Sequence, residues 1–76
     1  MIDHEKNLRK AIELSKQSID SGSSPFGCVI VDAEGKIVGE GHNRVAPDND
    51  PTAHGEIVAI RNACRNLGTF DLSGCI

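Results

Sequence analysis

The first stretch of alternating hydrophobic and polar positions predicts an amphipathic helix over residues 3–21. Apolar or small residues recur there at steps of three and four, which is the repeat of one helix face. These positions are Leu8, Ala11, Ile12, Ser15 and Ile19. Asp3 is placed to cap the start of the helix and Gly22 to end it. The stripe is narrow, so we expect a helix that covers another layer on one side only.

Two strands are predicted next. Residues 26–31 form an almost continuous apolar run, which is typical of a strand buried on both faces. A tight connection ending at Gly35 leads into a second strand over 36–43. Gly39 and Gly41 lie on one face of this second strand, which marks either a close approach by a ligand or another backbone, or an irregular edge.

A second helix follows a loop at 45–49. Asp50 or Thr52 is placed to cap it, Pro51 suits its first turn, and Gly68 is placed to end it. Its apolar positions have helical spacing and form a wide face. They are Ile57, Val58, Ile60, Ala63, Cys64 and Leu67. Such a face predicts a helix packed inside the protein.

The order of these elements predicts part of an α/β domain. Cys75 and Ile76 have the character of the first two residues of a third strand. A strand–helix–strand unit that starts at residue 36 predicts a parallel partner for the second strand. Only two residues of that partner are present, and an open sheet position is a liability for aggregation. We therefore expect residues 1–76 to be the N-terminal part of a single, larger domain.

Composition and charge narrow the class of protein. The net charge is −3 and the eight Lys and Arg residues are scattered, so we expect neither nucleic acid nor an anionic membrane as a partner. No apolar run approaches the roughly 20 residues of a membrane span. The polar, acidic stretch 1–5 is unlike a signal peptide, so we expect a cytoplasmic protein. Cys28, Cys64 and Cys75 lack the spacing of a disulfide or metal pair and are expected to be reduced, mostly buried thiols.

The candidate chemistry lies in the triplet His54-Gly55-Glu56 at the predicted start of the second helix. Side chains two positions apart point about 200° apart on a helix, so His54 and Glu56 converge only on a target beyond the helix end. The helix dipole favours an anion there, such as a metal-bound hydroxide. His54 would bind zinc, and Glu56 would take a proton from the activated water and return it to a leaving amine. The alternatives are a surface or capping histidine and a carboxylate that interacts only with the dipole.

The chain does not complete a zinc site by simple geometry. A catalytic zinc ion normally has three protein ligands. Cys64 is ten residues beyond His54 on the same predicted helix, roughly 15 Å away, and the other two cysteines lie on different elements. His4 and His42 lack ligand spacing. One ligand is visible and two are missing.

Three sequence blocks together resemble the cytidine deaminase-like superfamily. They are PFGCVIV at 25–31, GEGHN at 39–43 and DPTAHGE at 50–56. Within the superfamily they are most similar to bacterial guanine deaminases and related nucleoside deaminases, and the resemblance extends from about Leu8 to Ile76. The Pro-Phe-Gly start of the first block favours guanine deaminases over transfer-RNA adenosine deaminases.

This resemblance implies a three-layer α/β/α fold with a mixed sheet, truncated here after α-β-β-α and the start of the third strand. It implies hydrolytic deamination of a purine base or nucleoside, with guanine to xanthine favoured. His54 would bind Zn²⁺ and Glu56 would be the catalytic proton shuttle. Asn43 would hydrogen-bond the base and Phe26 would line its pocket. The alternatives are a turn residue for Asn43 and a core aromatic for Phe26.

The sequence also departs from the family pattern. Gly55 stands where the family usually has alanine, and the P-C-x-x-C segment that supplies two thiolate ligands is absent. We therefore expect the chain alone to be inactive and the intact protein to be a homodimer, as family members commonly are. One alternative is a transfer-RNA adenosine or a cytosine or cytidine deaminase of the same superfamily. Another is a non-catalytic half-domain module that dimerises through its open sheet.

Overall fold

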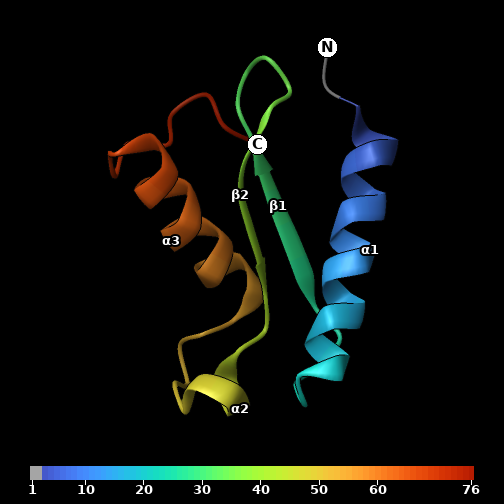
Figure 1. The fold of residues 1–76 in the computed structure, drawn as a ribbon. Helices are drawn as coiled ribbons and strands as arrows, with labels where there is room; N and C mark the ends of the chain where they lie inside the picture. Colours follow the sequence, from blue (N-terminus) through green and yellow to red (C-terminus); the bar gives the residue numbers. More distant parts are fainter. Residues whose placement is uncertain (1–2) are drawn as a thin grey trace.

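The computed structural model describes residues 3–76 and has three layers (Figure 1). The first two residues of the polar N-terminal stretch lie outside this range. The elements are α1 (His4–Asp20), β1 (Gly27–Val31), β2 (Ile37–His42), α2 (Val45–Asp48) and α3 (Gly55–Leu67). The α1 helix packs on one face of the two strands and α3 on the other. The predicted α/β/α arrangement is confirmed.

The α1 helix has the predicted ends but a different buried face. The Asp3 carboxylate accepts a hydrogen bond from the Lys6 amide at 3.0 Å, and Gly22 follows the helix with φ of 84°. The buried side chains are Leu14 and Ser18. Most of the predicted stripe is exposed, including Ile12 at 55%. Two strands cover only part of the apolar side of the helix, so the stripe extends beyond them.

β1 and β2 form an antiparallel pair, with Gly27 opposite His42 and a bulge before the pairing of Val31 with Ile37. The tight connection forms as predicted. One oxygen of the Asp32 carboxylate accepts the amides of residues 34 and 36, both at 2.9 Å, and Gly35 has φ of 87°.

Gly39 and Gly41 allow the backbone of α3 to approach the sheet closely. A Cβ atom added at Gly39 would lie 2.5 Å from the carbonyl oxygen of Ala59, and one at Gly41 would lie 2.5 Å from the Ala59 nitrogen. Of the two close approaches predicted for these glycines, the structure shows that of another backbone. The core that results consists of Ile30, Val38, Ala59 and Ala63.

The α3 helix begins later than predicted. It starts at Gly55 and not at Asp50 or Thr52, while Gly68 ends it as expected with φ of 69°. The predicted loop over 45–49 contains the short helix α2. Within residues 3–76 no helix is long and apolar enough to cross a membrane. The three cysteines are free, and each is half-buried and not mostly buried as predicted.

The third strand begins beside β1 and not beside β2. The amide of Ile76 donates to the Val31 carbonyl and the amide of Val31 donates to the Ile76 carbonyl, both at 2.9 Å. Such an exchange is the pattern of an antiparallel pair. Because β1 is antiparallel to both neighbours, the chain at Ile76 runs parallel to β2 but across β1 from it. The predicted parallel direction relative to β2 agrees with the structure. The prediction that this strand is the partner of β2 is wrong, because Ile76 pairs with Val31 of β1.

Candidate active site

His54 is the residue at which the chain enters α3. Its backbone is extended, with φ of −68° and ψ of 156°, and its carbonyl accepts the first helical hydrogen bond from Val58 at 2.9 Å. The side chain is exposed and makes no capping hydrogen bond. His54 is thus the N-cap residue by position, without a capping side chain, and its exposure agrees with the alternative of a surface histidine. Its imidazole stands at the positive end of a helix.

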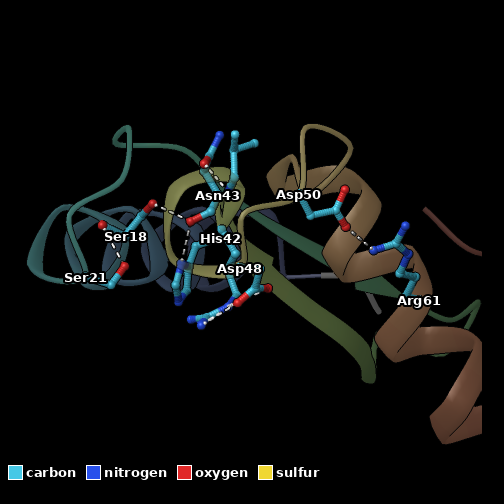
Figure 2. A network of polar contacts seen from close by, with 9 residues as sticks. Ser18, Ser21, His42, Asn43, Asp48, Asp50 and Arg61 are labelled. Carbon is cyan, nitrogen blue, oxygen red and sulfur yellow. Dashed lines mark hydrogen bonds and ion pairs between the residues drawn. The ribbon is translucent and has the colours of Figure 1, made fainter.

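The Asp50–Ala53 segment forms a braced turn that sets the position of His54. The Asp50 carboxylate accepts the Thr52 amide at 2.8 Å and the Thr52 hydroxyl at 2.7 Å. Arg61 of α3 forms an ion pair with Asp50 at 3.5 Å (Figure 2). The Thr52 hydroxyl, the Thr52 amide and Arg61 together lower the pKa of Asp50. The two predicted caps thus stabilise the turn, because the carboxylate is already satisfied before the helix begins.

Glu56 lies in the first turn of α3, with an exposed side chain. Its negative charge affects Cys28 on β1. The pKa of the Cys28 thiol is raised mainly by partial burial and, to a smaller extent, by the Glu56 carboxylate. A thiol with a raised pKa stays protonated near neutral pH and is a poor metal ligand. Glu56 on α3 and Cys28 on β1 thus interact electrostatically, and the Cys28 thiol stays protonated near neutral pH.

Asn43 is buried at the end of β2, at 7% exposure. Its backbone amide donates to the Phe26 carbonyl at 3.1 Å, and its side-chain oxygen accepts the Val45 amide at 3.0 Å. The side-chain oxygen is therefore engaged in a turn. Among residues 3–76 no acceptor is found for the Asn43 side-chain nitrogen, which stays available as a donor.

An open pocket of about 280 Å³, here called the cavity, brings Asn43 and His54 together at this end of the sheet. The remaining lining comes from the loop after α1 and from the start of α2, namely Gly22, Ser23, Ser24, Val45 and Ala46. The Phe26 ring is not part of this lining and is 63% exposed, although the Phe26 carbonyl holds Asn43. The sequence reasoning missed the serine-containing loop, for which the only signal was its position just before the first strand.

The residues present fit one ligand of a zinc site and do not complete one. The part of the chain that the structure describes contains no group of three or more His, Cys, Asp or Glu side chains able to hold a metal ion. His54 is accessible and stands at the correct end of α3, and the remaining ligands would have to come from outside residues 3–76.

Comparison with known proteins agrees with this geometry. The chain is 46% identical over 76 residues to guanine deaminase of Bacillus subtilis. The match covers 99% of this chain and 48% of that protein. It is 44% identical over 68 residues to the tRNA-specific adenosine deaminase of Aquifex aeolicus, covering 90% of this chain and 44% of that enzyme. The chain therefore spans about half the length of the curated relatives it matches.

The fold shows the same relationship. The crystal structure of B. subtilis guanine deaminase superposes with a TM-score of 0.88 at 45% identity, covering 97% of this chain and 47% of that one. The family model described as the cytidine and deoxycytidylate deaminase zinc-binding region matches residues 1–76. The chain belongs to this deaminase family.

Proposed function

We propose that this chain supplies the N-terminal half of a zinc-dependent enzyme that removes an amino group from a purine base by hydrolysis, with guanine to xanthine as the favoured reaction. The observation that carries the proposal is the meeting of His54 and Asn43 at one cavity, at the N-terminus of α3, in a chain of this family. We further propose that the complete protein is a cytoplasmic homodimer, which is the common state of the family.

Each of the four predicted residues has a role in this reaction. His54 would hold one position of a zinc ion, which supplies an activated water when bound. The Glu56 carboxylate accepts a proton from the attacking water and delivers it to the amino nitrogen. The bond from ring carbon to nitrogen breaks, a carbonyl replaces it, and ammonia leaves. The Asn43 side-chain nitrogen would donate to an acceptor on the base. The Phe26 ring lies outside the cavity lining in this chain and would have to turn towards the base to cover it.

A second candidate substrate is adenosine in transfer RNA. The identities to the guanine deaminase and to the tRNA-specific enzyme, 46% and 44%, differ too little to choose between them. The guanine deaminase match covers more of this chain, which supports guanine. The basic residues of this chain are scattered, which is evidence against RNA. It is weak evidence, because the rest of a complete enzyme could contribute its own basic surface.

A third candidate is a non-catalytic module that pairs with another chain along the open edge of β1. A groove of about 360 Å³ runs along this edge between α1 and β1. Apolar side chains that line it include Leu8, Ala11, Val29, Val31 and Ile76. A defined, folded oligomer of the chain alone would favour this candidate over the enzyme.

The chain alone is expected to bind zinc poorly and to release no ammonia. The protein is purified with zinc, and bound metal and ammonia released from guanine are then measured. Stoichiometric zinc together with turnover by residues 1–76 would contradict the proposal that this chain carries half a site.

A chimaera tests the roles of the residues. This chain replaces the matching part of the B. subtilis guanine deaminase, whose remaining part supplies the missing segments. Ammonia release from guanine is expected, with a loss of at least about 100-fold in Glu56→Gln and loss of bound zinc in His54→Ala. Glu34→Gln, an exposed carboxylate in the β1–β2 connection, is the matched control and should keep full activity.

The same design separates the substrates. A second chimaera uses the remaining part of the A. aeolicus tRNA-specific enzyme, and both proteins are assayed with guanine and with transfer RNA. If only the first chimaera releases ammonia from guanine, the part taken from the other enzyme determines the substrate. Guanine turnover in both chimaeras would show that this chain determines the substrate, and transfer-RNA deamination in both would favour the second candidate.

A further inference from the structure

Ser18 links the two sides of the candidate cavity. It lies on α1, is 0% exposed, and its hydroxyl is placed between two backbone carbonyls. The hydroxyl is 2.5 Å from the Ser24 oxygen and 3.1 Å from the Asn43 oxygen, and Figure 2 shows Ser18 directed at Asn43. Ser24 belongs to the loop that lines the cavity, and Asn43 lines the same cavity from the end of β2.

The backbone of Ser18 bonds the same loop. Its carbonyl accepts the Ser23 amide at 2.9 Å and the Ser21 hydroxyl at 2.9 Å. One buried residue therefore contacts the serine loop through its backbone and side chain, and contacts Asn43 through its side chain. A second connection runs through the backbone of Phe26, whose amide donates to the Ser24 oxygen and whose carbonyl accepts the Asn43 amide.

The hydroxyl is not required merely to satisfy buried carbonyls. The Ser24 oxygen also accepts the Phe26 amide at 2.9 Å, and the ring nitrogen Nδ1 of His42 lies 3.2 Å from the Asn43 oxygen. A serine hydroxyl has a single proton, which the two carbonyls share. Its particular contribution is to fix the distance between the loop and Asn43.

We propose that Ser18 is a positioning residue, which holds Asn43 and the Ser23–Ser24 loop in register so that the Asn43 side-chain nitrogen faces the ligand. This role rests on the proposed function for the nature of the ligand, a purine base. Ser18 itself is buried behind the cavity lining and touches no reacting atom.

The test compares Ser18→Ala with Ser15→Ala in the 76-residue chain labelled with ¹⁵N. Ser15 is the matched control because its hydroxyl bonds only its own helix, at 2.6 Å from the Ile12 carbonyl. In Ser18→Ala we expect a shifted Asn43 side-chain amide resonance and exchange of the Asn43 backbone amide that is about fivefold faster, the effect of one hydrogen bond. Ser15→Ala should change neither.

Two results would overturn the proposal. One is a response in Ser18→Ala confined to α1, with Asn43 unchanged; the other is an equal response in both variants. If Ser18→Ala fails to fold, the wild-type chain decides: a buried, bonded Ser18 hydroxyl proton should show nuclear Overhauser contacts to Asn43, and their absence would reject the link. No turnover is measured, so failure of the deamination proposal leaves this result intact.

Discussion

Glu56 and Cys28 come from different elements, yet the Glu56 carboxylate helps to raise the pKa of the Cys28 thiol, after the larger effect of burial. Removing the charge in Glu56→Gln should therefore lower the pKa of Cys28 and increase its thiolate fraction at a given pH. We expect faster alkylation of Cys28 by iodoacetamide near pH 8, measured by mass spectrometry. Glu34→Gln serves as control. An unchanged rate would place the Glu56 carboxylate away from β1.

The same thiol gives the chain a dependence of stability on pH. A folded-state pKa above the ordinary thiol value, about 8.5, means that the stabilisation is complete below that value and is lost as pH rises through the folded pKa. The unfolding free energy should therefore fall on the alkaline side, and less steeply in Cys28→Ala. Urea unfolding at pH 7 and pH 10 measures both slopes.

Gly55 and Gly41 differ in what an added methyl group would meet. At Gly55 the nearest atom is the Phe26 carbonyl oxygen at 3.3 Å, whereas at Gly41 two α3 backbone atoms lie at 2.5 and 2.7 Å. Gly55→Ala should change the stability far less than Gly41→Ala, because the Phe26 oxygen has to give by only a few tenths of an ångström to admit the methyl group. Gly41→Ala should destabilise the chain by about 1 to 3 kcal/mol. Denaturant unfolding checks the contrast, and equal effects of the two changes would contradict the packing described.

At the scale of elements, two asparagines of α3 protect the free edge of β2. Asn62 donates to the Glu40 carbonyl at 2.6 Å and Asn66 to the Val38 carbonyl at 2.8 Å. Four residues of helix rise about 6.0 Å and two residues of strand about 6.8 Å, so one asparagine per helical turn meets every second carbonyl. With these acceptors occupied, an incoming strand finds an edge that offers mainly donors.

Replacing both asparagines by alanine should expose the β2 carbonyls to a second copy of the chain. We expect concentration-dependent association of Asn62→Ala/Asn66→Ala in light scattering, with helix content retained because alanine favours helices. Gln17→Ala, an exposed amide on α1, is the control and should behave as wild type. Identical association in both proteins would show that the asparagines do not protect the edge.

At the scale of the whole molecule, the local signals in the sequence predicted more than the long-range ones. Gly35 and Gly68 mark the ends of elements correctly, because a positive φ is a local requirement. The helical repeat showed which α1 residues share a face, but not which face meets the sheet. Strand order and the contact of Ser18 with Asn43 depend on residues far apart in the chain, so no short pattern encodes them.

In the candidate site, too, local features could be predicted from the sequence and long-range contacts could not. The block that ends in His54 and Glu56 was recognisable because a turn and a helix start are specified by adjacent residues. The serine loop was missed because its position beside Asn43 results from the packing of α1 on the sheet, with Ser18 and Asn43 separated by 25 positions. For Gly39 and Gly41 the sequence left a close approach and an irregular edge open, and the structure shows the close approach of the α3 backbone.

The two edges of the sheet give a last prediction about the complete domain. Val29 and Glu40 face each other in the register. The Asn43 amide bonds Phe26, so by alternation the amide groups of Val29 and Glu40 point away from the partner strand, towards opposite edges. Ile76 has begun to pair along the β1 edge only. In the guanine deaminase chimaera the Val29 amide should therefore become protected from hydrogen exchange relative to the chain alone, while the Glu40 amide should not. Protection of Glu40 without Val29 would mean that the sheet grows from β2, contrary to the pairing of Ile76 with Val31.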